Sequence, residues 1–237
     1  MDLKLETTGL YEKPMLIQPS QHGQLRLKQQ TTFQFAQHLP AVPLVAQEFM
    51  DAAGSLPIIF SRSGEQFLPQ AVLGVTPGRN LFVDTSGQWQ AGAYVPAYVR
   101  RYPFVFLEHD EQYLLCIEQG AVEEESDDNE QLQRLGDQQV LDRALGFCNA
   151  YQQQWQATEE FCQVLSDMQL LEEKRIRVDK KGTESRFLTG LYSVELDKLN
   201  SLTPKKFSTL RDRGWLPAVY AQLHSWTKFQ DLLIRAG

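Results

Sequence analysis

Two adjacent arginines in a tyrosine-rich stretch have the clearest capacity for chemistry in this chain. The stretch reads YVPAYVRRYPF, residues 94–104, with a proline near each end. Guanidinium groups bind carboxylates and phosphates through paired hydrogen bonds, and aromatic rings commonly line small-molecule pockets. The sequence therefore predicts a site for an anionic ligand or a peptide carboxylate, formed by Tyr94, Tyr98, Arg100, Arg101 and Tyr102.

A structural role for the same arginines is the preferred alternative. On a helix, Tyr98 and Tyr102 would share one face, and Arg101 would be turned about 100° from Arg100. A guanidinium group is weakly hydrated and stacks on aromatic rings, so it is tolerated in half-buried niches. We expect at least one of the two arginines to be buried, stacked on a neighbouring tyrosine and paired with a carboxylate. The other should face outward.

A second set of residues, His109, Glu111 and His224, imitates the two-histidine, one-carboxylate ligands of non-haem iron oxygenases. Glu111 lies at the predicted tip of a hairpin, and His224 lies within a predicted helix beside Trp226. Because nothing in the sequence brings them together, a surface histidine and a packed histidine are the preferred interpretation. We predict no metal site and no cofactor, and the sequence identifies no catalytic residues. An enzyme of unrecognised type, such as an iron oxygenase, stays an alternative.

Motifs of other common site classes are missing from the sequence. It contains no GxGxxG, GxxxxGK[ST], GxSxG or HExxH pattern. The lysine pairs at 180–181 and 205–206 lack the interleaved aromatic residues and the basic excess of nucleic-acid-binding surfaces. We therefore expect no nucleic-acid partner.

The acidic character of the chain is local. The formal net charge is −7, yet ten of the 30 acidic residues lie between Tyr102 and Gln133, where there is no lysine or arginine. Closely spaced like charges disfavour compact structure, so residues 121–136 are predicted to form a solvated acidic loop or linker. The spacing and central glycine of an EF-hand are absent.

Compartment is indicated by two features. No apolar run approaches the ~18 residues of a spanning helix, and the N-terminus lacks the apolar core of a signal peptide. Cys116, Cys148 and Cys162 are odd in number and dispersed, which favours buried thiols in a reducing compartment. We expect a soluble, cytoplasmic protein without membrane insertion.

Residues 1–120 are predicted to form an antiparallel sheet with short helices. Alternation and turn residues indicate strands at 15–18 and 24–29, a helix at 42–54, a three-stranded meander and a hairpin. The meander would use 56–62, 66–75 and 80–84, and the hairpin 104–108 and 113–118.

Residues 137–237 are predicted to be mainly helical, with a long amphipathic helix at 137–171 and one hairpin at 175–194 turning at 180–183. Closing helices follow, with Thr203 as an N-cap and Gly214 as a stop. The fold class is thus α+β. Because the tryptophans Trp155, Trp215 and Trp226 need partners, we expect both parts to share a core and to unfold as one unit.

In several of the segments described above, the chain resembles the bacterial SapC family. The resemblance rests on YVPAYVRRYPF, VPLVAQEF, LPIIFSR, LGV…NLFVD and GLYSVELDKLNSL…LRDRGWLPAVYAQLHSW, in this order along nearly the whole chain. It implies an accessory or binding protein without catalysis, acting on a partner protein or a small anionic ligand. The family's gene surroundings imply a tryptophan halogenase-like protein as a partner, and its name implies a surface-layer role as a further alternative.

Overall fold

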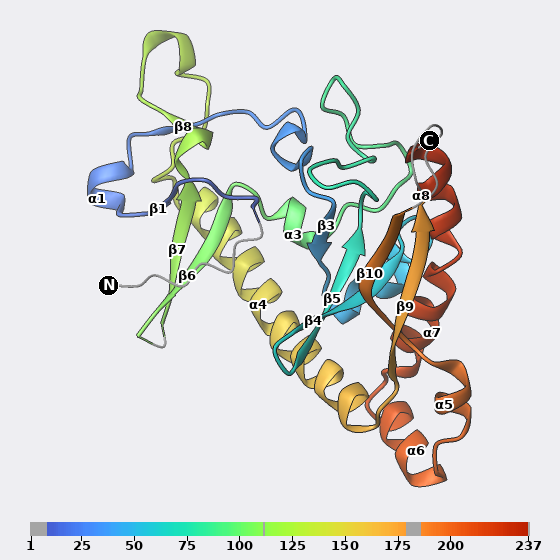
Figure 1. The fold of residues 1–237 in the computed structure, drawn as a ribbon. Helices are drawn as coiled ribbons and strands as arrows, with labels where there is room; N and C mark the ends of the chain where they lie inside the picture. The colour runs from blue at the N-terminus through green and yellow to red at the C-terminus, as the bar shows by residue number, and fades with distance from the viewer. Residues whose placement is uncertain (1–8, 111, 179–185, 237) are drawn as a thin grey trace.

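A computed structural model describes residues 9–110, 112–178 and 186–236 of the protein (Figure 1). Antiparallel sheets and short helices form the first half of the chain, and a mainly helical second half carries one β-hairpin. The predicted α+β class is confirmed. Among the described helices, none has the length and apolar character needed to cross a membrane.

The largest sheet has five strands in the order β3-β5-β4-β10-β9, all antiparallel. Its strands are β3 (Ala41–Pro43), β4 (Ile58–Ser63), β5 (Gln66–Val72), β9 (Leu171–Val178) and β10 (Arg186–Val194). The apolar run of Ile58, Ile59 and Phe60 is fully enclosed, as expected for a strand covered on both faces. This sheet joins strands from both halves of the chain.

Two predictions in this region were wrong in detail. The strand beside β5 is β3, whereas residues 80–84 form a loop in which only Val83 makes a β-bridge, to Trp89. The predicted helix at 42–54 begins later, with the 3₁₀ turn η2 (Ala46–Glu48) and the helix α2 (Phe49–Ala52). Pro43 lies in β3, an edge strand, where its missing N–H is tolerated.

Two smaller sheets lie on the other side of the molecule (Figure 1). One has the order β1-β7-β6, and the other pairs β2 with β8. Their strands are β1 (Pro14–Leu16), β2 (Arg26–Leu27), β6 (Phe104–His109), β7 (Gln112–Glu118) and β8 (Val122–Glu123). The predicted hairpin at 104–118 is confirmed.

The helix α4 (Gln138–Asp167) is the longest element and runs beneath both sheet regions, as Figure 1 shows. It confirms the long helix predicted at 137–171. Its buried line advances in steps of three or four residues, the period of an amphipathic helix. The buried members are Val140, Ala144, Cys148, Tyr151, Trp155, Thr158, Phe161, Cys162 and Leu165.

The remaining helices are short. They are α1 (Pro19–His22), α3 (Ala97–Arg100), α5 (Leu196–Asn200), α6 (Pro204–Asp212), α7 (Leu216–Ser225) and α8 (Lys228–Ala236), with 3₁₀ turns η1 (Gln34–Ala36), η3 (Gln119–Ala121) and η4 (Asp127–Asn129). Thr203 caps α6 by accepting a hydrogen bond from the Lys206 N–H, as predicted. Gly214 follows α6 with a positive φ of 71°, which explains the predicted stop.

An aromatic cluster forms the centre of the main core. Phe161 of α4 lies 6.0 Å from Phe49 and 5.6 Å from Trp215, measured between ring centroids. Phe60 of β4 completes the cluster. Side chains from both halves of the chain therefore pack together. The hairpin turn predicted at 180–183 lies outside the described residues.

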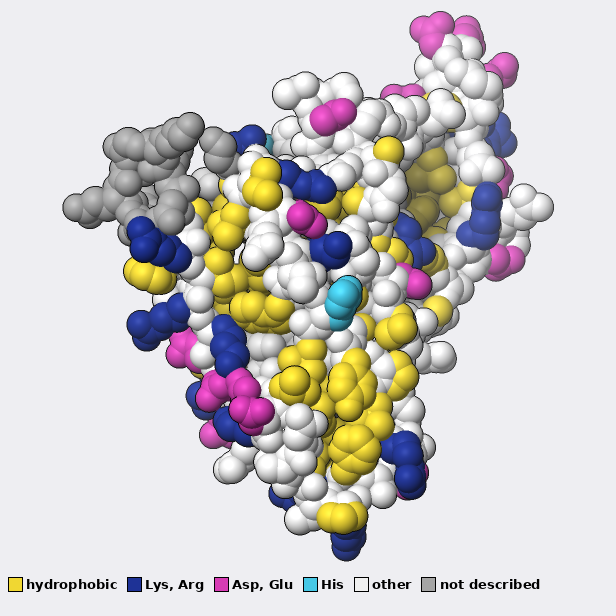
Figure 2. Space-filling view, turned by 90° about the vertical axis from the view of Figure 1, so that its right-hand side faces the viewer, with side chains coloured by type: hydrophobic (Ala, Val, Ile, Leu, Met, Phe, Trp, Pro, Cys, Tyr) yellow, Lys and Arg dark blue, Asp and Glu magenta, His cyan; other side chains and the backbone are white. Residues whose placement is uncertain are grey.

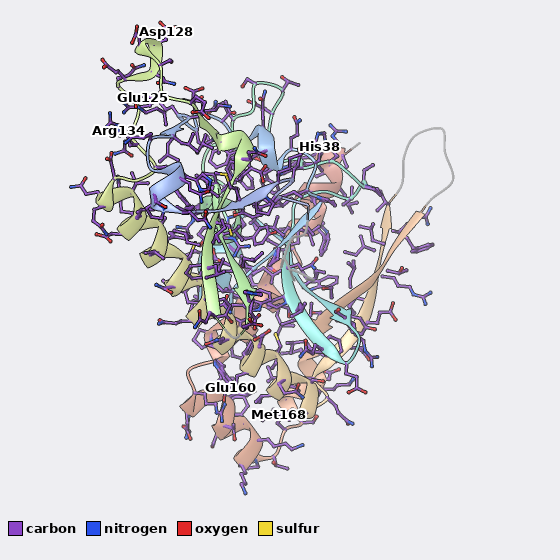
Figure 3. All side chains as sticks on the ribbon, turned by 90° about the vertical axis from the view of Figure 1, so that its left-hand side faces the viewer. His38, Glu125, Asp128, Arg134, Glu160 and Met168 are labelled. Carbon is purple, nitrogen blue, oxygen red and sulfur yellow. The ribbon has the colours of Figure 1, made fainter. Side chains whose placement is uncertain are left out.

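The acidic segment forms a projecting loop with ordered ends. Figure 3 shows Glu125 and Asp128 on this projection, with Arg134 near its base. The returning chain pairs with the region of β2, because the amides of Leu27 and Leu135 donate to the carbonyls of Gln133 and Leu25. The structure thus places residues 131–135 beside β2.

Apolar side chains also reach the surface opposite this loop. Figure 2 shows them gathered over the lower part of one face, where α5 and α7 lie. Leu196 of α5 and Tyr220 of α7 are among the exposed hydrophobic residues.

Candidate functional site

The short helix α3 directs the two adjacent arginines to different environments. Ala97, Tyr98 and Val99 are buried, so the helix is anchored along most of its length. Arg100 is the last helical residue and Arg101 is the C-cap. The Arg101 residue is only 7% exposed, whereas the Arg100 side chain is 46% exposed. The prediction that one arginine is buried and the other faces outward is confirmed.

Arg101 lies in a cage of tyrosine rings. Its guanidinium carbon is 4.5 Å from the ring centroid of Tyr98, 4.6 Å from that of Tyr151 and 5.8 Å from that of Tyr11. Burial lowers the pKa of Arg101, but the surrounding tyrosines, Tyr11 foremost, outweigh this effect and raise it. Arg101 therefore stays charged at neutral pH.

The carboxylate predicted beside the buried arginine is not there. In the described part of the chain, Arg101 forms no ion pair, and its Nε and Nη2 atoms have no hydrogen-bond partner. Its neighbours are π faces, which attract a cation without accepting conventional hydrogen bonds. The predicted stacking on Tyr98 is correct, and the predicted ion pair of this residue is wrong.

The carboxylate lies instead beside the exposed arginine. Glu48 Oε1 is 3.6 Å from Arg100 Nη2, and Glu48 is only 5% exposed. Glu48 also accepts hydrogen bonds from the Tyr94 hydroxyl at 2.7 Å and from the Ala97 N–H at 2.6 Å. Burial raises the pKa of this carboxyl, while its hydrogen-bond donors and Arg100 oppose the rise. Glu48 thus fixes the start of α3 and holds Arg100 on one side.

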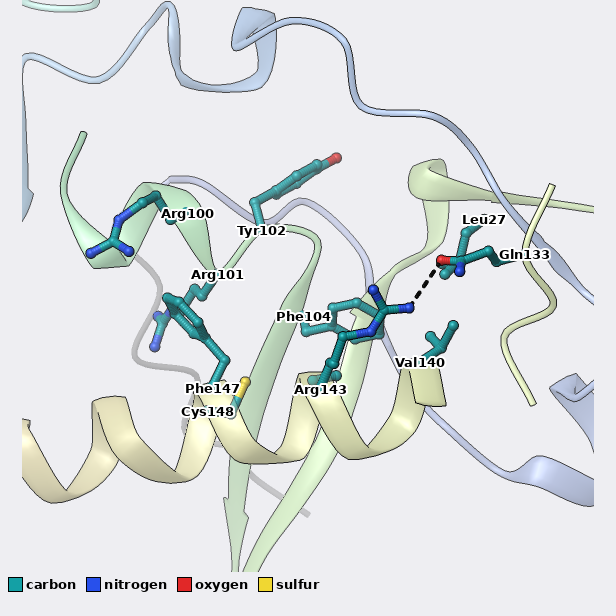
Figure 4. A pocket seen from close by; sticks show the side chains of 11 residues that line it. Leu27, Arg100, Arg101, Tyr102, Phe104, Gln133, Val140, Arg143, Phe147 and Cys148 are labelled. Atoms are coloured by element: carbon teal, nitrogen blue, oxygen red, sulfur yellow. Dashed lines mark hydrogen bonds between the residues drawn. The ribbon is translucent and has the colours of Figure 1, made fainter. Parts of the chain in front are cut away.

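A cavity of about 290 Å³ lies between α3, α4 and the segment that follows the acidic loop (Figure 4). Its lining residues are Leu27, Arg100, Arg101, Tyr102, Phe104, Gln133, Val140, Arg143, Ala144, Phe147 and Cys148. Among the described residues, the lining contains three arginines and no acidic residue. The cavity is therefore a region of positive potential with an apolar floor.

The α4 side of the cavity is formed by residues one turn apart. Figure 4 shows Arg143, Phe147 and Cys148 rising from α4 toward α3. Arg143 is oriented by hydrogen bonds from Nε to the Gln139 carbonyl at 3.0 Å and from Nη2 to Gln133 Oε1 at 3.4 Å. The Arg100 guanidinium lies 5.7 Å from the centroid of the Phe147 ring. Two arginines from different elements thus face the same space.

The residues present suit binding better than catalysis. Cys148 is the one thiol in the lining, and burial raises its pKa to about 11, so it is a protonated, weak nucleophile. Guanidinium groups stay protonated and cannot act as general bases. The arrangement can hold an anionic group by charge and hydrogen bonding, with an apolar part of the ligand against the floor.

Only some of the predicted site residues line this cavity. Arg100, Arg101 and Tyr102 do, whereas Tyr98 lies buried against Arg101 and Tyr94 is engaged with Glu48. Whether any of the five binds a ligand stays a prediction.

Sequence reasoning missed Arg143 and Phe147. These residues are four apart and lie beside the buried line of α4, which is the available signal. That signal alone does not reveal which element α4 meets at this point.

The structure does not bring the two histidines of the alternative iron site together. His109 ends β6, and its Nε2 lies 3.4 Å from Asp110 Oδ2. His224 belongs to α7, which lies apart from β6 in Figure 1, across β4 and β5. Glu111 lies outside the described residues. Within the described ranges, no three His, Cys, Asp or Glu side chains gather as a metal site.

The three cysteines are buried and unpaired, as predicted.

Comparison with known proteins identifies a family. A protein-family model described as SapC matches residues 17–232 of the 237-residue chain. No curated protein and no solved structure matches the chain.

Proposed function

The chain belongs to the SapC family, and we propose that it is a binding protein whose cavity between α3 and α4 takes an anionic group. The observation that carries this proposal is the set of three arginines around one cavity, with no acidic residue among the described residues that line it. The anionic group is a carboxylate or a phosphate on a small molecule or on a partner. No catalytic step is assigned to the site.

Charge balance supports the proposal. Arg100 is compensated in part by Glu48, but Arg101 and Arg143 have no ion-pair partner in the described part of the chain. Opposite charges about 4 Å apart attract by about 4 kcal/mol at the effective dielectric constant near a protein surface. An anion in the cavity would gain such attraction from more than one arginine. The cavity therefore favours anions over neutral molecules of the same shape.

The three arginines contribute differently. Arg101 Nε and Nη2 are enclosed by protein atoms, so Arg101 supplies a fixed charge within the wall. Arg143 and Arg100 are more exposed and can form direct hydrogen bonds with the anion. A buried charge surrounded by low-dielectric material focuses its field into the adjoining cleft. Direct contact and long-range attraction are thus divided between residues.

Size and lining limit the ligand. A volume of about 290 Å³ lies at the small end of ligand cavities. Apolar side chains form much of the wall, namely Leu27, Phe104, Val140, Ala144 and Phe147. The best fit is an anionic group attached to a short apolar body.

An accessory role on a partner protein is part of the proposal, and a tryptophan halogenase-like protein is the candidate that the family resemblance implies. The three buried thiols support a reducing compartment, the cytoplasm, for this role.

The direct test is binding of small acids, measured by saturation-transfer NMR with isovalerate, benzoate and phenyl phosphate. Isovaleramide and benzamide are the neutral controls of matching shape. We expect isovalerate and benzoate each to bind at least about tenfold more tightly than the matching amide, because a charge-assisted hydrogen bond is lost with the charge. Arg143→Gln should weaken the binding of the acids by about tenfold without lowering the unfolding temperature of the protein.

Arg62→Gln is the matched control, since Arg62 is an exposed arginine on β4, outside the cavity. It should leave acid binding unchanged. Equal binding of acids and amides, or loss of acid binding in both arginine variants alike, would overturn the proposal.

A further inference from the structure

A second hollow adjoins the cavity. That hollow has a volume of about 490 Å³ and is lined by Leu27, Lys28, Gln29, Gln30, Tyr102, Pro103, Phe104, Gln131, Leu132 and Gln133. It shares Leu27, Tyr102, Phe104 and Gln133 with the arginine cavity. The two hollows therefore adjoin at these residues, and we call them together the long groove, with the arginines at one end and Lys28 toward the other.

The walls of the outer part are rich in side-chain amides. Gln29 and Gln30 come from the segment after β2, and Gln131 and Gln133 come from the end of the acidic loop. Each amide offers two donors and a two-lone-pair acceptor, which match the N–H and C=O groups of a peptide backbone. No acidic residue is among the described residues that line this outer part.

The wall after β2 has unused hydrogen-bonding groups in its main chain. The Lys28 N–H donates to the Ala121 carbonyl, which ends the pairing of this segment with the β8 side. Gln29 and Gln30 form no hydrogen bond with other described residues, through either backbone or side chain. An extended segment with such free groups can pair with an added peptide strand.

The charge distribution gives the occupant a direction. A peptide's terminal carboxylate is its one obligatory anion, and the arginine end of the long groove is where several cations meet. The apolar floor at Val140, Ala144 and Phe147 would then face the last side chain of the peptide. Lys28 would favour an acidic side chain farther back along the chain.

We propose that the long groove binds the C-terminal tail of a partner polypeptide. The terminal carboxylate lies among the arginines, the last side chain is apolar, and the preceding backbone runs between residues 28–30 and 131–133. The inference rests on the proposed function, because it places the anionic group in the same cavity. It adds the identity of that group and the class of partner.

The experiment compares two randomised libraries of short peptides on the immobilised full-length protein. One library has free C-terminal carboxylates, and the other has the same sequences as C-terminal amides. We expect enrichment from the free-acid library alone, with apolar last residues. A selected peptide, followed by fluorescence anisotropy, should bind about tenfold or more weakly as its amide or to Arg143→Gln.

Gln30→Pro separates the inference from the proposed function. Proline removes the N–H that would pair with the peptide, and Gln30 does not line the arginine cavity. This variant should bind the selected peptide about fivefold or more weakly than the parent does, and it should bind isovalerate as the parent does. Unchanged isovalerate binding shows that Gln30→Pro is folded, and the double variant Gln29→Ala, Gln30→Ala, which keeps both backbone donors, separates the loss of the side-chain amides from the loss of the backbone N–H.

Three outcomes decide the question. If isovalerate binds but the free-acid peptides bind no more tightly than N-acetylleucine, the inference fails and the proposed function stands. If ADP binds more tightly than any selected peptide and displaces isovalerate, the occupant is a nucleotide and the inference fails. If neither small acids nor peptides bind, both fail.

Discussion

Gln222 and Arg101 are both buried polar residues, but they differ in their hydrogen bonding. Gln222 has partners for its side-chain amide, whereas two guanidinium nitrogens of Arg101 have none among the described residues. Gln222 of α7 is 0% exposed and lies where α7 meets β4 and β10. Its Nε2 donates to the Ile58 carbonyl at 3.0 Å, and its Oε1 accepts from the Val194 N–H at 3.1 Å. The amide thus closes a gap between two strands whose own pairing is short.

Around Gln222 the neighbouring polar atoms also have partners. The Ser225 hydroxyl donates to the Gln222 carbonyl at 2.6 Å and accepts from the Ile58 N–H at 2.9 Å. The Ser193 hydroxyl contacts the Gln222 side chain. A network in which each member is satisfied gives rigidity and a unique arrangement. This region is built for the fold.

The cage around Arg101 follows a different rule. Two of its three guanidinium nitrogens have no hydrogen-bond partner among the described residues, although burying a charge is costly unless it is paired. The cation is retained beside a cavity that two further arginines line. We interpret the retained cation as a fixed charge for an anion in the cavity, kept at the expense of stability.

The largest effect is expected for Gln222→Leu. Leucine fills a similar volume but removes the partners of the Ile58 carbonyl and the Val194 N–H. Each orphaned buried group costs about 1–3 kcal/mol. We expect the free energy of unfolding to fall by about 3 kcal/mol or more, measured by urea denaturation. A loss of less than about 1 kcal/mol would show that this network does not hold the sheet to α7.

Unlike Gln222, Arg101 should tolerate an apolar replacement of similar volume with little change in the free energy of unfolding. Arg101→Met keeps much of the side-chain volume and removes an unpaired buried charge, which offsets the lost cation–π contacts. We expect a free energy of unfolding within about 1 kcal/mol of the parent and a loss of acid binding. Arg101→Ala, which leaves a void among the tyrosines, should cost about 2 kcal/mol.

The two Arg101 variants together test the comparison by urea denaturation and isovalerate binding. If methionine destabilises as much as alanine does, Arg101 is a structural residue like Gln222, and its incomplete hydrogen bonding has no functional meaning.

Much of the fold could be predicted because its signals are local. The buried line of α4, the Thr203 cap and the hairpin at 104–118 each follow from periodicity or turn chemistry within a short window. The choice of β3 as the neighbour of β5 is not local. Residues 80–84 have an equally strand-like composition, but Asn80 uses its side chain to bond the Ala36 carbonyl and the Phe82 N–H, which holds a loop there.

The candidate site could be predicted in part for the same reason. The stretch around α3 is recognisable by its composition, so the sequence predicts Arg100, Arg101 and Tyr102 as site residues, and all three line the cavity. Arg143 belongs to the cavity only because α4 passes α3 at that height. The exchange of partners, with Glu48 beside the exposed arginine and tyrosines around the buried one, depends on packing between residues about fifty positions apart along the chain.

Glu48 gives a smaller, pH-dependent effect. Its raised pKa means that the folded protein binds a proton more tightly at this carboxyl than the unfolded chain does. The contribution of Glu48 to stability is therefore fully present below the ordinary carboxyl value of 4.5 and is lost as pH rises through the folded pKa. Glu48→Gln, which keeps an acceptor, should remove this loss.

Thermal unfolding should be measured from below pH 4.5 upward through the raised pKa of Glu48. As the pH is raised, the parent should lose stability relative to Glu48→Gln. Glu65→Gln, at the exposed turn between β4 and β5, is the control and should follow the parent. If the parent gains stability relative to Glu48→Gln over the same range, Arg100 and the hydrogen-bond donors outweigh burial at Glu48.

The smallest global effect is expected in the acidic loop, which contains its own satisfied residue. Asn129 donates from Nδ2 to the Glu124 carbonyl at 2.8 Å and accepts at Oδ1 from the Ser126 N–H at 2.9 Å. These bonds close a loop that projects from the body (Figure 3), so they stabilise a local unit. Asn129→Ala should change the free energy of global unfolding by less than about 1 kcal/mol, yet speed hydrogen exchange at Ser126 and proteolysis within 121–136. Asp128→Ala, at the exposed tip, should change neither. If Asn129→Ala instead lowers global stability as much as Gln222→Leu does, the loop belongs to the cooperative core, and satisfied polar networks stabilise the whole molecule wherever they lie.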